Sequence, residues 1–162
     1  MDGLPAGFES NFSWLIGQVF HAHVTESQRA LEDFPASQRG YMVVQAAVSG
    51  CARNQLEMSK ILGLDRTVMV YLVDELVKAG LVERVPDPAD RRNRLIVATE
   101  EGRARLLDAT ERVAQVDERL LAPLQGADRE RFREMLRQLV GHRHDDPHGA
   151  CARAAAIADG GK

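Results

Sequence analysis

Three arginines close together, between two strand-like runs, give the clearest indication of chemistry in the sequence. Arg91, Arg92 and Arg94 fall within four residues, with Asn93 among them, at the end of a polar, proline-containing segment. A guanidinium on the tip of a narrow loop can enter the minor groove of duplex DNA, where the electrostatic potential is most negative. Asp90 is close enough to hold the Arg92 guanidinium through two parallel hydrogen bonds. The alternative is an ordinary solvated loop, and the sequence of this segment taken alone favours that alternative.

The predicted helix before this loop, residues 65–78, has two different faces. One face is apolar at helical spacing and is predicted to pack inward: Met69, Leu72, Val73 and Leu76. The opposite face is the candidate recognition surface: Arg66, Thr67, Val70, Tyr71 and Asp74. Threonine and valine methyl groups can meet thymine methyl groups in the major groove, where arginine can reach guanine or a phosphate. The alternative is a plain amphipathic helix with two stray apolar residues, and the arginine-tipped loop that follows favours DNA recognition.

These residues are positioned by helices on either side of a tight turn. The sequence predicts helices from about 11 to 31, from 37 to 48, from 54 to 62 and from 65 to 78, with Gly63 stopping the third. Asn54 and Glu57 have the spacing of a capping box, and Asn54 and Gln55 are included among the predicted DNA contacts. Two strands, at 81–85 and 94–98, then form a β-hairpin with a charged tip. This layout is a winged helix-turn-helix.

Two further helices are predicted after the hairpin. Thr99 caps a long helix that Pro123 interrupts, and Asp128 caps a sixth helix that ends at Gly141. Apolar residues recur at heptad-like spacing along the long helix and predict a partner helix there: Leu106, Ala109, Val113, Val116 and Leu120. The sixth helix carries one apolar stripe: Phe132, Met135, Leu136 and Leu139. The predicted fold class is therefore mainly α with a small β-hairpin.

Composition and missing motifs narrow the classes of function. A net charge of −3 does not exclude nucleic acid, because a DNA reader needs only one basic face. No apolar run reaches the roughly 18 residues of a membrane helix, and the first residues lack a signal-peptide pattern. We therefore expect a cytoplasmic protein with no membrane partner. A Gly-rich phosphate loop, a nucleophile elbow and a His-Glu-x-x-His motif are all missing, so neither an enzyme nor a cofactor is expected.

The cysteines and histidines suggest only minor hypotheses. Cys51 and Cys151 are a hundred residues apart and form no disulfide framework. His142, His144 and His148 precede Cys151, but their spacing matches no closed zinc motif. No metal site is predicted. Sensing of a metal by this tail, or of an oxidant by Cys51, stays an alternative.

The central part of the chain contains a recognisable run. It reads LGLDRTVMVYLVDELVKAGLVER at 62–84 and continues with Asp-Pro-Ala-Asp-Arg-Arg at 87–92 and Thr-Glu-Glu-Gly at 99–102. These residues resemble the MarR family of repressors, specifically over about residues 54–105 and more loosely in the flanking helices. The Asp-x-Arg signature of that family's wing falls on Asp90 and Arg92, and its Leu-x-x-x-Gly-Leu-Val falls on residues 76–82.

The resemblance implies a homodimeric transcriptional regulator. Residues 1–36 and 100–141 would form the dimerisation helices, residues 37–99 would be the winged helix-turn-helix DNA-binding region, and residues 142–162 would be a tail. Two such lobes would read a pseudo-palindromic operator in double-stranded DNA. A small aromatic or lipophilic effector would release the DNA, as in many repressors of this family.

Two features of this chain qualify what the resemblance implies. Trp14, His21 and Gln28 recur at seven residues on the first helix, which borders the effector pocket in this family; they could bind an aromatic acid or instead fill the dimer interface. Tyr71 stands where many members carry a basic or polar residue, and Val68 and Val70 stand where they carry hydroxyl residues. Base readout would therefore depend on apolar contacts and the wing. A dimeric interaction protein that has lost DNA binding is the alternative function.

Overall fold

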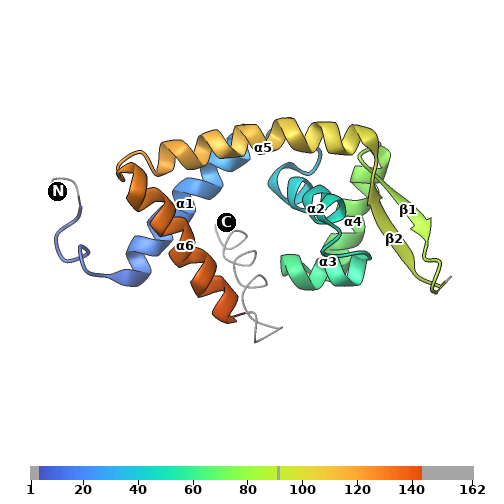
Figure 1. Cartoon of the computed structure of the whole chain (residues 1–162), viewed down its shortest axis with the longest axis horizontal. Coiled ribbons are helices and arrows are strands. Elements are labelled where there is room, and N and C mark those ends of the chain that lie inside the picture. The colour runs from blue at the N-terminus through green and yellow to red at the C-terminus, as the bar shows by residue number, and fades with distance from the viewer. Residues whose placement is uncertain (1–3, 91, 144–162) are drawn as a thin grey trace.

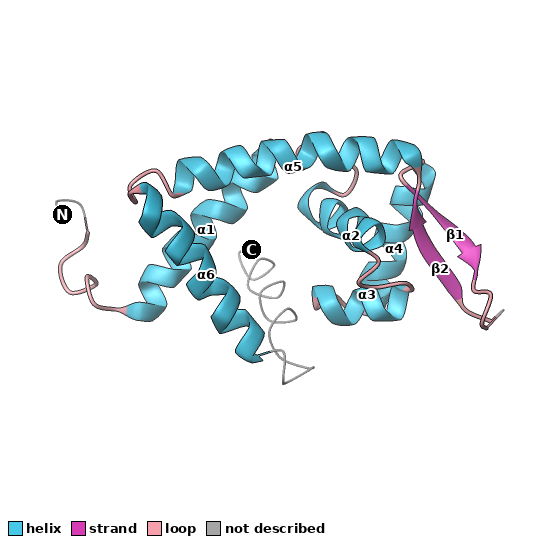
Figure 2. Cartoon of the chain, viewed as in Figure 1, coloured by secondary structure: helices cyan, strands magenta, loops and turns pink. Residues whose placement is uncertain are grey.

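The computed structural model describes residues 4–90 and 92–143. Within them the chain forms six helices and one two-stranded sheet (Figures 1 and 2): α1 (Phe12–Ala30), α2 (Ser37–Ser49), α3 (Gln55–Leu62), α4 (Arg66–Lys78), β1 (Val82–Pro86), β2 (Arg94–Ala98), α5 (Glu100–Leu120) and α6 (Gly126–Arg143). The long helix α5 runs along one side of the molecule and joins two groups of elements. The first group, α1 and α6, is the arm, and the second, α2 to α4 with the hairpin, is the lobe. The predicted fold class is confirmed.

Local side-chain caps set the helix starts close to the predicted positions. Asn11 Oδ1 accepts a hydrogen bond from Trp14 N at 3.0 Å and begins α1. Leu31 and Phe34, in the turn after α1, are buried, so the chain reverses direction against the core. Helix α2 ends at Gly50, whose φ of 68° lies in the left-handed region that glycine adopts without steric cost.

The helix-turn-helix formed by α3 and α4 is confirmed, with one difference in its cap. Asn54 Oδ1 accepts from Glu57 N at 3.0 Å, as the capping box predicts. The Glu57 carboxylate, however, accepts from Arg53 N at 2.7 Å, one residue before the expected donor. The glycine between the two helices has a φ of 64°. Asp65 Oδ1 then accepts from Thr67 N at 2.7 Å and begins α4.

The hairpin is attached to the lobe at its base and along the outer edge of β2. The two strands pair antiparallel, with Val82 opposite Ala98 at the base. Ile96 N donates to Arg53 O at 2.8 Å, which joins the segment before α3 to the outer side of β2. This third segment fixes the direction in which the hairpin projects from the lobe.

The start of α5 is held directly against the end of α4. Thr99 Oγ1 accepts from Gly102 N at 2.9 Å and donates to Gly80 O at 2.6 Å. A Cβ atom added at Gly102 would lie 2.0 Å from Leu81 O, so only glycine allows this approach. The end of α4, the base of the hairpin and the start of α5 therefore meet at one joint.

The predicted partner of the α5 apolar positions lies within the same chain. Leu106 and Ala109 are buried in the core that α2, α4 and the hairpin share, and Val116 is buried farther along α5, where α1 packs. The first half of α5 therefore belongs to the lobe and the second half to the arm. For the buried members of this set, the predicted partner helix is therefore supplied by the same chain.

Two ion pairs connect helix α6 to α5. Glu118 on α5 accepts hydrogen bonds from Arg129 at 3.0 Å and from Arg133 at 2.6 Å. The bond from Arg133 is the largest cause that lowers the pKa of Glu118 below its ordinary value of 4.5. The predicted end at Gly141 is wrong, because the helix continues to Arg143. None of the described helices combines the length and hydropathy needed to cross a bilayer.

Candidate nucleic-acid interface

The outward face of α4 exposes the side chains that the sequence places there. The inward residues Met69, Leu72, Val73 and Leu76 are all buried, as predicted. Arg66, Thr67 and Val70 are exposed on the other face, and Tyr71 retains 70% of its accessible surface. The exposed tyrosine ring presents apolar surface that the monomer leaves unburied. Nothing in the described chain covers this face.

Asp74 has a partner that sequence reasoning did not identify. Its Oδ1 accepts from the Arg84 guanidinium at 2.5 Å. Arg84 lies on β1, so the pair ties the recognition helix to the hairpin. The signal was present in the sequence as opposite charges ten residues apart, but only the packing of β1 beside α4 brings them together. Asp74 therefore connects α4 to β1 and is at the same time exposed on the outward face of α4.

The two predicted contacts at the start of α3 are partly occupied within the lobe. Asn54 Nδ2 donates to Glu57 Oε1 at 2.8 Å while its Oδ1 caps the helix. Gln55 is half-buried, and its Nε2 atom is buried with no hydrogen-bond partner. The Asn54 amide is therefore used within the lobe, and the Gln55 amide nitrogen is buried, whereas the outward side chains of α4 are exposed.

The wing tip is organised by Asp90, although not in the predicted way. Asp90 Oδ1 accepts from Arg92 N at 3.0 Å, Asp90 O accepts from Asn93 N at 2.9 Å, and Asp90 Oδ2 lies 3.4 Å from Asn93 Nδ2. The carboxylate therefore fixes the backbone of the turn instead of the Arg92 guanidinium. In the described part of the chain, the guanidinium groups of Arg92 and Arg94 contact no carboxylate. Arg91, the third predicted arginine, lies outside the described residues.

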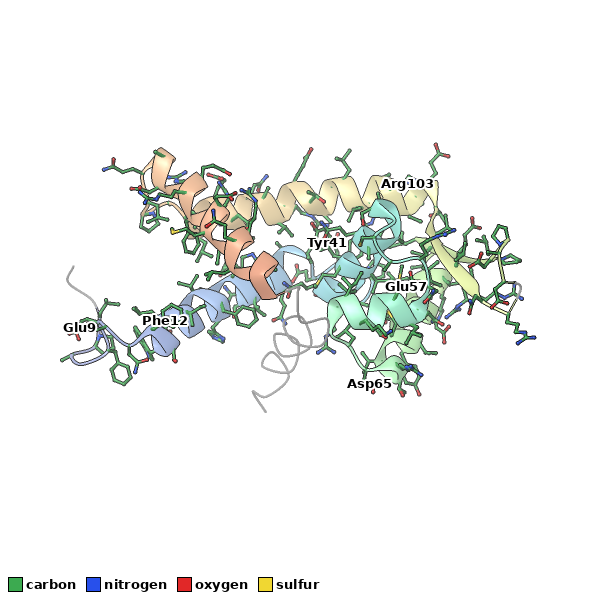
Figure 3. The ribbon with its side chains drawn as sticks, turned by 60° about the horizontal axis from the view of Figure 1, so that its bottom comes forward. Glu9, Phe12, Tyr41, Glu57, Asp65 and Arg103 are labelled. Carbon is green, nitrogen blue, oxygen red and sulfur yellow. The ribbon has the colours of Figure 1, made fainter. Side chains whose placement is uncertain are left out.

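Ion pairing divides the arginines of the molecule into two groups. Seven arginines on α1, α5, α6 and β1 are paired with carboxylates: Arg29, Arg84, Arg105, Arg112, Arg129, Arg133 and Arg137. Among the described residues, Arg66 on α4 and Arg92 and Arg94 on the wing form no ion pair, and neither do Arg53, Arg103, Arg119 and Arg131 in other parts of the fold. In Figure 3, Asp65, at the start of α4, lies at the bottom of the lobe, and Arg103 of α5 lies at its top. Three unpaired arginines thus lie on α4 and the wing, although the chain has a net charge of −3.

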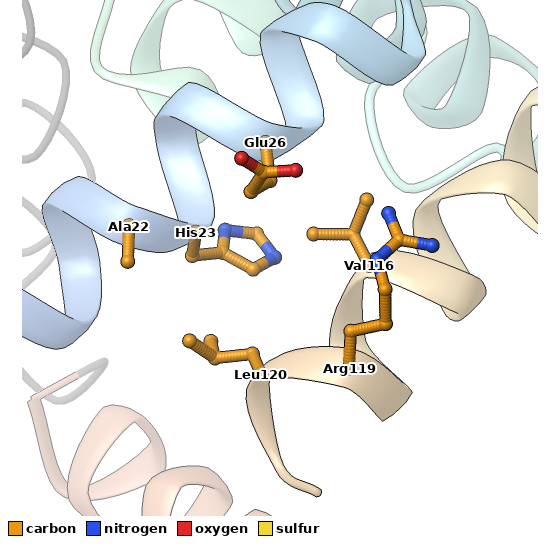
Figure 4. Close-up of a pocket in the computed structure, with 6 residues that line it drawn as sticks. All are labelled: Ala22, His23, Glu26, Val116, Arg119 and Leu120. Carbon is orange, nitrogen blue, oxygen red and sulfur yellow. The ribbon is translucent and has the colours of Figure 1, made fainter.

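A small cavity lies between α1 and α5, away from the DNA-facing residues. Its volume is about 280 Å³, and it is lined by Ala22, His23, Glu26, Val116, Arg119 and Leu120. In Figure 4, the residues of α1 face those of α5 across this space. His23 Nε2 lies 2.9 Å from Asp117 Oδ1. The pair is separated by 94 residues in sequence, so local patterns could not have revealed it.

The three residues predicted to border an effector pocket do not line this cavity. Trp14 is half-buried and stacks obliquely on Phe8, with 5.4 Å between ring centroids. His21 and Gln28 are exposed on α1. The structure places His23, two residues farther along the helix, at the cavity instead.

The minor hypotheses on sulfur and metal have little to add. Cys51 is an exposed free thiol, and Ser49 Oγ donates to its Sγ at 3.1 Å. The four residues of the suggested metal site have side chains outside the described part of the chain: His142, His144, His148 and Cys151.

The helix-turn-helix packs one face on the core and is followed by a projecting hairpin, and both elements carry unpaired arginines. These features define a winged-helix DNA-binding protein. Comparison with known proteins agrees with this class. The profile of the MarR family matches residues 48–93. A MarR-family transcriptional regulator from Rhodococcus sp. RHA1 is 35% identical, with a TM-score of 0.65, over 78% of this chain and 87% of that one.

Two structures of CouR are also similar. CouR from Rhodococcus jostii RHA1, solved with p-coumaroyl-CoA, is 32% identical, with a TM-score of 0.71, over 83% of this chain and 95% of that one. A structure of the transcriptional repressor CouR on a 23-mer DNA duplex is 25% identical, with a TM-score of 0.74, over 85% of this chain and 99% of that one. The present chain belongs to the MarR family of transcriptional regulators.

Proposed function

We propose that this protein is a ligand-responsive repressor that binds a pseudo-palindromic operator as a homodimer. The observation that carries the proposal is the distribution of positive charge. Seven arginines on α1, α5, α6 and β1 are neutralised by carboxylates, whereas Arg66, Arg92 and Arg94, on the recognition helix and the wing, form no ion pair among the described residues. Phosphates of duplex DNA are the natural counter-charges for such a surface. The related CouR on a DNA duplex supports the same function.

Two elements of the lobe divide the work of recognition. Helix α4 is suited to the major groove, where Val70 and Tyr71 offer apolar contact to thymine methyl groups and Arg66 offers hydrogen bonds. The wing, with Arg92 and Arg94, is suited to the adjacent minor groove. Arg91 and Asn93 belong to the same proposed wing set. Asp90 acts indirectly, because its carboxylate shapes the turn that presents the arginines.

The dimer is proposed from apolar surface that the monomer leaves uncovered. On α1, Phe12 retains 72% of its accessible surface, and Ile16 and Val19 are exposed beside it. Helix α6 exposes its own stripe: Met135, Leu136, Leu139 and Val140. Burial of apolar surface is the main driving force of association. A second copy of the arm is the occupant that would cover both helices.

The proposed division of the chain follows from this arrangement. Residues 1–36 and 100–141 provide the dimerisation helices, and residues 37–99 read DNA, with the first half of α5 completing the core of the lobe. We expect no catalytic activity, in keeping with a family of transcriptional regulators, and we expect the protein to act in the cytoplasm, where its DNA would be.

The cavity between α1 and α5 is the proposed effector site. His23 and Arg119 supply an imidazole and a guanidinium, and Val116 and Leu120 supply apolar walls. This combination suits a small aromatic carboxylate or its thioester, and the p-coumaroyl-CoA complex of CouR supports that class. Trp14, His21 and Gln28 do not line this cavity, so His23 and Arg119 take their place in the proposed effector site.

The test is equilibrium binding to duplex DNA from the region upstream of the protein's own gene. Affinity should fall steeply as salt rises, because binding releases counterions from the phosphates. A fragment of equal length and shuffled sequence is the control. Equal affinity for the two fragments, or no binding to either at low salt, would reject operator recognition. Thermal-shift measurements with aromatic acids then test the effector site, since a ligand of the native state raises the melting temperature.

A further inference from the structure

The turn between α1 and α2 adopts an unusual backbone conformation. Ala36 and Ser37 are adjacent non-glycine residues with φ values of 58° and 51°. Left-handed backbone is unfavourable for residues with a Cβ atom, and it persists only where surrounding contacts hold it. Ala36 provides no side-chain cap for α2. The contacts that hold this turn must therefore come from elsewhere in the fold.

One of these contacts comes from the recognition helix. Glu75, on α4, accepts a hydrogen bond at its Oε1 from Ala36 N at 2.9 Å. This carboxylate replaces the missing side-chain cap of α2 and satisfies an N–H group that the helix leaves free. The turn and the end of α4 also line a shallow depression together. The last turns of α4 are thus attached to the α1–α2 connection.

The other contacts come from α5. Asp33 Oδ1 accepts from Arg112 at 2.6 Å, and Asp33 O accepts from Arg105 at 3.1 Å. Arg112 is itself paired with Asp108 at 3.1 Å. Both arginines lie on α5, the helix that runs from the lobe into the arm. The turn is therefore held from two sides, by α4 through Glu75 and by α5 through Asp33.

From this arrangement we infer that Glu75 and Asp33 are positioning residues that set the angle between the recognition helix and the arm, and through it the half-site spacing that the dimer accepts. The inference rests on the proposed function, because spacing has meaning only for a dimer that reads two half-sites. Glu75 is not one of the outward residues assigned to DNA. Its effect would pass through the turn to α5, and from there to the second subunit.

Half-site spacing is a sensitive readout of this angle. Moving one half-site by one base pair rotates it by about 34° and shifts it by about 3.4 Å along the DNA. A dimer with firmly held lobes should discriminate strongly between such spacings. Lobes released from the arm should discriminate less, whatever their total affinity.

The experiment compares variants on a spacing series. An operator is selected from a random duplex library with wild-type protein, and duplexes are then made with one or two base pairs added or removed between the half-sites. Fluorescence anisotropy gives the affinity ratio between the selected spacing and each altered one. We expect Glu75→Ala to lower that ratio at least about fivefold, and Glu75→Gln, which keeps an acceptor oxygen, to preserve it. Glu32→Ala, in the same turn, is the matched control and should behave like wild type.

Asp33→Ala, which removes the acceptor of the Arg112 hydrogen bond, supplies an independent variant on the α5 side, and it should lower the same ratio if the turn is the connection. A uniform loss of affinity at all spacings in Glu75→Ala and Asp33→Ala, with the ratio unchanged, would overturn the inference and leave operator binding intact. Failure of wild-type protein to select any duplex would instead overturn the proposed function. If Glu75→Ala does not fold, the ratio measured for Asp33→Ala decides the matter.

Discussion

Removing the Arg92 guanidinium should weaken operator binding without disturbing the wing. The turn at the wing tip depends on backbone donors, since Arg92 N bonds to Asp90 Oδ1 at 3.0 Å and Asn93 N bonds to Asp90 O at 2.9 Å. Arg92→Ala keeps both hydrogen bonds. The side chain itself contacts no carboxylate in the described residues, so its loss leaves no buried charge without a partner. The melting temperature should therefore change by no more than about 2 °C.

The size of the binding defect follows from two wings in each dimer. An arginine contact to DNA contributes about 1–3 kcal/mol, so losing two contacts costs at least about 2 kcal/mol, or roughly 30-fold in affinity. Each phosphate neutralised contributes about 0.9 to the slope of log affinity against log salt concentration. If both arginines neutralise a phosphate charge, the slope should become shallower by about 1.8 in magnitude.

Anisotropy titrations at four or more salt concentrations measure both quantities. Arg103→Ala is the matched control, because Arg103 is an exposed arginine on the side of the lobe away from Asp65 (Figure 3). This control should keep the wild-type affinity and slope. The minor-groove role of Arg92 would be refuted by an Arg92→Ala protein whose affinity and salt dependence match those of the control.

Three further predictions concern the arm and the joint. Truncation after Gly126 should give a folded monomer, because the buried core of the lobe contains no residue of α6, whereas α6 carries an exposed apolar stripe proposed for the dimer; a sedimentation experiment that still shows dimers would contradict this. The pKa of Glu118 is lowered by the arginines of α6, so its stabilising contribution is present above its ordinary value of 4.5 and disappears as the pH falls through the lower folded-state value. The melting temperatures of wild type and Glu118→Gln should therefore differ most near neutral pH and converge as the pH falls below 4.5 and through the lower folded-state pKa; a difference that stays constant throughout this acid range would refute the shift. Gly102→Ala should destabilise the fold by about 1–3 kcal/mol in chemical denaturation, because its Cβ would meet Leu81 O. Gly141→Ala, which has open space around it, is the control and should not destabilise.

The sequence determined the parts of this protein that depend on neighbours within four residues. The caps at Asn11, Asn54, Asp65 and Thr99 were predictable because each acceptor and its donor N–H lie two or three residues apart. The buried face of α4 was predictable because helical periodicity alone places those residues on one side. The family resemblance located the wing and the recognition helix for the same reason, since its motifs are local.

Local reasoning reached the right residue but the wrong contact at Asp90. The spacing of Asp90 and Arg92 allowed either a side-chain pair or a hydrogen bond to the backbone N–H. An exposed turn has little to hold a long guanidinium in place, whereas an aspartate two residues before an N–H group closes a compact turn. The backbone contact is the one that forms.

Only the tertiary structure decided which distant residues meet. His23 pairs with Asp117, Asp33 with Arg112, and Glu75 with the backbone of Ala36. Each of these contacts depends on how one helix is rotated and shifted against another, and a change of one residue turns a helical side chain by about 100°. The periodic residues of α5 showed that a partner helix was required, but they could not say that α1 and α2 of the same chain would supply it.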